Sequence, residues 1–152
     1  MKKSSSSKKI GITFFPGNKN YLASISYDVL DEVGENIDEI LNKAANIYKT
    51  HLEKMHYLLQ KRALVRNKNK FIPARYMWKI GNEIFVMIEK LSEYGLFIEN
   101  LYGILSRDLN ISRTVIKRLV SLRRYFPNID DLPEDLSWGK IKNAPKRFSS
   151  SK

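Results

Sequence analysis

Apolar residues recur at spacings of three and four along most of the chain after residue 27, which is the period of an amphipathic helix. The longest such stretch predicts a helix over residues 27–64. Its apolar side consists of Val33, Ile37, Ile40, Ala44, Ile47, Tyr48, Leu52, Met55, Leu58 and Leu59. A helix of this length can form a coiled coil. Because its spacing is irregular, however, packing against the rest of the domain is the favoured interpretation.

Shorter helices follow, and each has a local start or stop signal. Pro73 suits the first turn of a helix, and Gly95 suits the residue after its end. Ser112 and Ser137 are expected N-caps, and Pro127 ends the helix that Ser112 begins. The predicted ranges are a polar loop over 66–70 and helices over 73–94, 96–107, 112–125 and 138–143. The body is therefore predicted to be all-α, with a long N-terminal helix packed on a helical domain.

The N-terminal region differs from this pattern. Pro16-Gly17-Asn18 is a turn signal, and the apolar stretches 12–15 and 21–25 on either side are compatible with a pair of short strands or with an irregular arm. The predicted organisation is a basic flexible arm over 1–27, one helical domain over 28–145 and a basic flexible tail over 146–152.

Charge is unevenly distributed over the 152 residues. The chain holds 27 Lys and Arg against 16 Asp and Glu, a net charge of +11. Residues 1–19 and 140–152 contribute ten bases and no acid, which leaves 17 bases and 16 acids for the part between them. The chain is therefore a nearly neutral domain with two basic ends.

Two basic stretches lie within this domain. Residues 42–82 hold ten bases against Glu53 alone, and residues 112–124 hold five bases and no acid. Segregated positive charge attracts a phosphate backbone, although a solvated helix face can look the same. Together with the basic ends, these stretches favour a polyanionic partner.

The third and fourth predicted helices have the layout of a helix-turn-helix unit over residues 96–126. In such units the second helix enters the DNA major groove through its N-terminal part. Its expected core side comprises Val115, Ile116, Leu119, Leu122 and Phe126. The alternative is an amphipathic helix whose polar face happens to be basic.

The candidate DNA contacts divide by role. Arg113, next to the N-cap, is expected to contact a base edge, since arginine to guanine is the commonest specific contact. Thr114 suits a phosphate or a thymine methyl group. Phosphate contacts, which position the protein without specifying sequence, are expected for Lys117, Arg118, Arg123 and Arg124. The full set is Arg107, Arg113, Thr114, Lys117, Arg118, Ser121, Arg123 and Arg124.

Four motifs, in order, resemble the N-terminal helical, winged-helix-like domain of the YhcG-type PD-(D/E)xK nucleases. They are Trp78-Lys79-Ile80-Gly81-Asn82-Glu83-Ile84, Tyr94-Gly95 with Leu105-Ser106-Arg107-Asp108-Leu109, Ile111-Ser112 with Leu119 and Leu122-Arg123-Arg124-Tyr125-Phe126-Pro127, and Leu136-Ser137-Trp138. The resemblance covers residues 40–145 and implies a DNA-binding or partner-binding module without the nuclease domain. The family's catalytic half needs an Asp followed by Asp/Glu-x-Lys on adjacent strands. Glu134-Asp135 with Lys140 lacks that spacing, so no enzymatic activity is expected.

Other chemistry finds little support. Cysteine is absent, and no phosphate-binding loop, dinucleotide fingerprint, zinc-protease motif or nucleophile elbow is present. His51 and His56 are five residues apart, so a metal site with Glu53 is less favoured than two partly exposed surface histidines. No cofactor or metal is expected. Without a membrane-length apolar run or a secretory signal, the expected compartment is the cytoplasm.

The aromatic side chains are expected to lie mostly in the core. Trp78, Phe85, Tyr125 and Trp138 fit that interpretation. Exposure of Tyr125 or Trp138 beside the basic helix would instead indicate stacking on nucleic-acid bases.

Three hypotheses remain. The leading one is a non-catalytic module that binds duplex DNA through the helix-turn-helix unit. The alternative is a protein-interaction or assembly module that pairs through the helix over 28–64 with a second copy or another protein, including a separate nuclease subunit. The third is RNA binding through the tails and the stretch 42–82.

Overall fold

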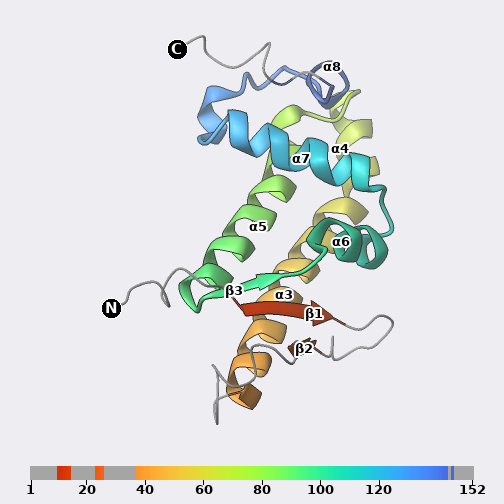
Figure 1. Cartoon of the computed structure of the whole chain (residues 1–152). Helices are drawn as coiled ribbons and strands as arrows, with labels where there is room; N and C mark the ends of the chain where they lie inside the picture. The colour runs from red at the N-terminus through yellow and green to blue at the C-terminus, as the bar shows by residue number, and fades with distance from the viewer. Residues whose placement is uncertain (1–9, 15–22, 26–36, 144, 146–152) are drawn as a thin grey trace.

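The computed structural model describes residues 10–14, 23–25, 37–143 and 145. Two long helices, α3 (Ile37–Gln60) and α5 (Ala74–Glu93), run side by side in opposite directions (Figure 1). The short helix α4 (Arg62–Asn69) joins them at one end, and a small sheet lies towards the other. Helices make up most of the described residues, so the all-α prediction is confirmed, with this sheet added.

Apolar residues at helical spacing hold α3 against α5. On α3, the side chains of Ala44, Tyr48, Leu52 and Met55 are fully buried. They join the buried side of α5 in one hydrophobic core. Burying a large apolar side chain contributes about 1.5–3 kcal/mol. The stripe that suggested a coiled coil is thus largely used inside the domain.

The predicted long helix is wrong at its C-terminal end. It stops at Gln60, and α4 begins at Arg62. At this interruption, two backbone carbonyl oxygens accept hydrogen bonds from side chains. The Tyr76 hydroxyl donates to the Leu58 oxygen at 2.6 Å, and Arg62 Nε donates to the Leu59 oxygen at 3.2 Å. The predicted start lies outside the described residues, which on this helix begin at position 37.

The polar loop predicted over 66–70 is also wrong for most of its length, because α4 continues to Asn69. The Asn69 amide donates to the Val65 carbonyl oxygen at 2.9 Å, which supports the last turn. Lys70 ends the helix in the left-handed conformation, with φ of 68°. Pro73 then flanks the start of α5, which begins at Ala74, one residue from the predicted boundary.

The three-stranded sheet has the order β2-β1-β3. β1 (Ile10–Phe14) pairs antiparallel with β2 (Ala23–Ile25), which confirms the short strands proposed for the arm. It also pairs parallel with β3 (Leu96–Ile98), with Ile10 opposite Leu96 and Ile12 opposite Ile98.

β3 corrects the prediction of a helix over 96–107. Its central side chain, Phe97, is exposed while the two outer ones are buried, which is the alternation of a strand. Gly95 before it and Asn100 after it have positive φ values of 72° and 54°. These left-handed residues separate the strand from α5 and from α6 (Leu101–Leu109).

α7 (Arg113–Tyr125) follows α6 after a three-residue turn. Ser112 caps it as predicted, since its Oγ accepts a hydrogen bond from the Val115 amide at 3.2 Å. The turn is further fixed by Ser106 Oγ, which donates to the Ile111 carbonyl oxygen at 2.6 Å.

α7 packs most extensively against α5. The two backbones approach closely at Gly81, where a Cβ atom would overlap the carbonyl oxygen of Leu119. A larger residue would therefore push the two helices apart. On the far side of this crossing, Trp78 Nε1 donates to the Phe126 carbonyl oxygen at 2.6 Å and fixes the end of α7.

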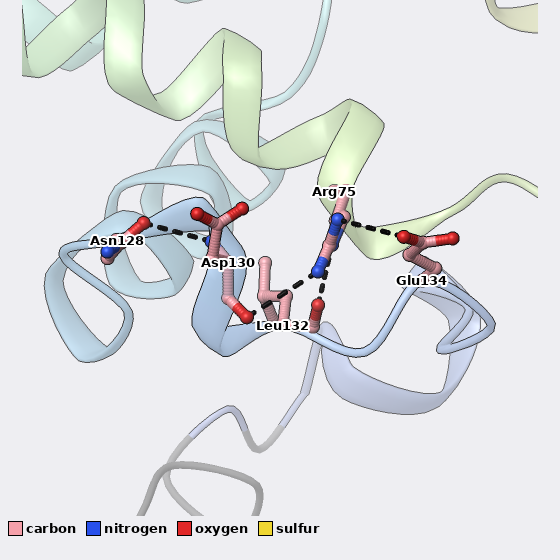
Figure 2. Close-up of polar contacts among 5 residues, drawn as sticks. All are labelled: Arg75, Asn128, Asp130, Leu132 and Glu134. Carbon is pink, nitrogen blue, oxygen red and sulfur yellow. Dashed lines mark hydrogen bonds and ion pairs between the residues drawn. The ribbon is translucent and has the colours of Figure 1, made fainter.

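The segment after α7 is held against the start of α5 by Arg75. Its Nε donates to the Leu132 carbonyl oxygen at 2.6 Å, and its Nη1 lies 3.6 Å from the Glu134 carboxylate (Figure 2). The segment contains the short helix η3 (Ile129–Asp131), started by the Asn128 side chain. It ends in α8 (Trp138–Ile141), whose predicted cap, Ser137, accepts from the Lys140 amide at 3.2 Å.

Among the helices in the described part, none combines the length and the hydropathy needed to cross a lipid bilayer. The predicted tails over 1–9 and 146–152 lie outside the described residues.

Candidate nucleic-acid interface

α7 has one side in the core and one side in solvent. Ile116, Leu119 and Leu122 are buried as predicted, and so is Phe126 just beyond the helix. Val115 is only half-buried. The helix is therefore packed into the core from Ile116 to Leu122, and its outer side faces solvent.

The outer side of α7 gathers most of the predicted DNA contacts, and we call it the basic face. Its residues fall within an arc of about 140° around the helix axis. The exposed residues are Arg113, Thr114, Lys117 and Arg124, and the half-buried ones are Arg118 and Ser121. α7 contains no carboxylate. Within the described residues, no ion pair joins an acidic side chain to any of these four cations.

Arg113 lies over the start of α6. A Cβ atom built on Gly103 would be 2.8 Å from Arg113 Nη2 and 2.6 Å from the side-chain amide atoms of Asn100. The guanidinium therefore occupies space that the missing side chain of Gly103 leaves free. It remains exposed at the junction between the two helices.

Arg123 does not belong to the basic face, so its predicted phosphate contact is not favoured by the structure. Its Nε donates to Asn82 Oδ1 at 2.9 Å, and its guanidinium lies 4.7 Å from the ring centre of Phe85 and 5.5 Å from that of Trp78. The side chain ties α7 to α5. The sequence holds the signal for this, because Arg123 follows the buried Ile116 by seven residues, which is two helical turns.

Arg107 is engaged within its own helix. Its Nε lies 2.8 Å from Asp108 Oδ1, and this hydrogen bond raises the pKa of Arg107. The same carboxylate accepts a hydrogen bond from the Tyr48 hydroxyl at 2.5 Å. The charge of Arg107 is thus locally compensated, unlike the charges of the basic face.

The aromatic predictions divide. Trp78 and Trp138 are buried in the core, as expected, and Phe85 is half-buried. Tyr125 is 41% exposed at the C-terminal end of α7, so its assignment to the core is wrong. An exposed ring beside cationic side chains is the arrangement that suits stacking on a base.

The histidine prediction is wrong for His51. Its side chain is only 2% exposed, and Nδ1 lies 2.6 Å from Glu83 Oε1, which joins α3 to α5. Its Nε2 is buried, and no hydrogen-bond partner for it lies among the described residues. The spacing carried this signal, because His51 lies three residues after the buried Tyr48 and four before Met55. Among the described residues, no group of three His, Cys, Asp or Glu side chains is arranged to hold a metal ion.

Comparison with known proteins gives no assignment. No protein-family model matches the chain, and neither a curated protein nor a solved structure matches it. The resemblance to the nuclease-associated domain therefore stays a prediction from the sequence motifs.

Proposed function

We propose that this chain is a non-catalytic DNA-binding module in which α6 and α7 act as a helix-turn-helix unit. The observation that carries the proposal is the basic face of α7, where four cations lie on a helix whose other side is packed into the core, without a carboxylate partner among the described residues. Such a surface attracts phosphate groups along both sides of a groove.

In this proposal the two ends of α7 have different roles. Arg113 and Thr114, at the N-terminal end, contact base edges, because recognition helices enter the major groove by that end. Lys117, Arg118 and Arg124 contact phosphates, and Ser121 lies between them. The exposed ring of Tyr125 extends the same surface. The resemblance in the sequence motifs points to the same class of function.

Fluorescence anisotropy with a labelled duplex of two helical turns tests the proposal. If Lys117, Arg118 and Arg124 each neutralise one phosphate, log K falls against log salt with a slope of about −2.7 between roughly 50 and 200 mM salt. The double variant Lys117→Gln/Arg124→Gln removes two contacts and is expected to reduce that slope by about 1.8. A variant that binds like the wild type at every salt concentration contradicts the proposal.

A matched control removes the same charge elsewhere. Lys49 on α3 and Lys90 on α5 are both exposed. Lys49→Gln/Lys90→Gln is expected to leave the slope within about 0.5 of the wild-type value, because neither residue is assigned a phosphate contact. An equal loss in both double variants indicates a general effect of net charge and contradicts a specific surface on α7.

The base-reading role of Arg113 needs its own comparison. Arg113→Ala is expected to weaken binding to a duplex selected from a random pool by about 1–3 kcal/mol more than binding to random DNA. The same loss on both duplexes would assign Arg113 to a phosphate.

The alternative, pairing through the long helix, finds less support. Of its apolar residues, Ala44, Tyr48, Leu52, Met55 and Leu59 are buried within the domain. A partner helix would therefore have to use other side chains of α3. Light scattering at high protein concentration tests this alternative, which requires a dimer when the partner is a second copy.

A further inference from the structure

α4 is a basic helix that contributes nothing to the buried core. Within residues 61–70 the chain has five bases and no acid, namely Lys61, Arg62, Arg66, Lys68 and Lys70. Four of them are exposed, and Arg62 is half-buried. No residue of the helix is buried, and Leu64 is 62% exposed.

Such a helix is unfavourable when it stands alone. Eight residues are too few for a stable isolated helix, so packing normally has to support it. Arg62 and Arg66 are four residues apart on one side, where like charges repel. Lys70 ends the helix in the left-handed conformation, which residues other than glycine, asparagine and aspartate rarely adopt. Arg66 and Lys68, in the last turn, interact favourably with the helix dipole, but this interaction does not remove the repulsion between the arginines.

A polyanion would offset these costs. Phosphates placed along α4 would neutralise the repelling cations and would need no apolar contact. A lipid surface fits less well, because a membrane-bound helix separates an apolar side from a charged side. Here Lys61 and Lys68 lie on the same side as Leu64, three residues before it and four after it.

We propose that α4 is a second phosphate-binding surface, which holds the backbone of the nucleic acid that α7 contacts. α4, α7 and α8 gather at the end of the α3–α5 pair away from the sheet (Figure 1). The proposal therefore requires one duplex to reach both helices at this end of the molecule. The identity of the nucleic acid as duplex DNA rests on the proposed function, whereas the phosphate contact rests on the charges of α4 itself.

The test compares three double variants in the same salt series of duplex anisotropy. Lys61→Gln/Lys68→Gln removes two exposed charges seven residues apart, one at the N-cap of α4 and one within it, and Lys117→Gln/Arg124→Gln removes two charges seven residues apart on α7. Lys49→Gln/Lys90→Gln is the control. Circular dichroism and thermal melting of each variant establish that the fold is retained. Anionic vesicles of phosphatidylserine and phosphatidylcholine serve as a second probe.

The α4 variant is expected to reduce the salt slope by about 1.8 and to weaken binding by up to about 60-fold at 0.1 M salt, with the same loss on every duplex sequence. Wild-type binding by the α4 variant, with a loss in the α7 variant, overturns this inference and leaves the proposed function standing. A loss in the α4 variant alone supports α4 and contradicts the role of α7. An α4 variant that loses vesicle binding but keeps duplex binding overturns the inference in favour of a lipid surface.

Discussion

Two adjacent arginines on α7 are predicted to have opposite roles. Arg123 is held between the rings of Phe85 and Trp78 and donates to Asn82, whereas Arg124 is exposed. A hydrogen bond from a charged group contributes about 1.5–3 kcal/mol, and a cation–π contact at a partly exposed site contributes about 0.5–1 kcal/mol. Because the guanidinium is half-buried, we take the lower ends of these ranges. Arg123→Ala is therefore expected to reduce the free energy of unfolding by about 2–3 kcal/mol.

Thermal unfolding followed by circular dichroism measures this loss. For a chain of this size, 2–3 kcal/mol corresponds to a decrease in Tm of about 4–12 °C. Arg124→Ala is the matched control, since it removes the same charge from the neighbouring position, and its change is expected to stay within about 0.5 kcal/mol. The salt slope of duplex binding is expected to fall for Arg124→Ala and to stay unchanged for Arg123→Ala. An unchanged Tm together with a reduced slope for Arg123→Ala would refute the structural role of this arginine.

Three further changes test the packing and its pH dependence. Gly81→Ala is expected to destabilise the fold by about 1–3 kcal/mol in urea unfolding, because its Cβ would overlap the Leu119 carbonyl oxygen; unchanged stability would mean that the two helices are not in close contact. Tyr48→Phe removes the hydrogen bond of 2.5 Å from the Tyr48 hydroxyl to the Asp108 carboxylate. It is expected to reduce the free energy of unfolding by about 1–3 kcal/mol in the same assay. Burial raises the pKa of Tyr76 above its ordinary value of 10.0, so the folded state favours the protonated phenol. The stabilisation by Tyr76 is complete below pH 10 and is lost as the pH rises through the raised pKa of the folded state. An alkaline absorbance titration is expected to show one late-titrating tyrosine, which Tyr76→Phe removes.

The helices were predictable because their signals are local. The serine N-caps of α7 and α8 and the glycine after α5 mark ends within a few residues, and apolar spacing marks the buried sides. The break at Lys61 was not predictable in this way. It coincides with a hydrogen bond from Tyr76, which reaches the Leu58 carbonyl group from another helix.

β3 was missed for a related reason. In a stretch of only three residues, the alternation of a strand cannot be distinguished from the spacing of a helix. Leu96 and Ile98 also pair with a strand more than eighty residues earlier in the chain, so the contact that forms β3 is not local. The signals that remain local are Gly95 and Asn100, whose left-handed conformations isolate the strand. Asparagine is among the residues that adopt this conformation more readily, yet composition alone does not require it.

Most of the basic face was predictable from the spacing of the arginine and lysine residues along α7. Residue type alone predicts that Arg123 and His51 lie on the surface. Their positions relative to buried neighbours two turns or one turn away indicated the core side in both cases. A charged or polar residue on the buried side of a helix is better interpreted as one that hydrogen-bonds to a neighbouring helix. Arg123 and His51 both form such a hydrogen bond to α5.

The most direct test of the central claim is a titration of the isotope-labelled protein with duplex DNA, followed by backbone amide NMR shifts. We expect the largest shifts at Arg113, Thr114, Lys117 and Ser121, with a second group on α4. Shifts confined to the residues around Lys49 and Lys90, or no shifts at moderate salt, would contradict the claim that the basic face of α7 binds DNA.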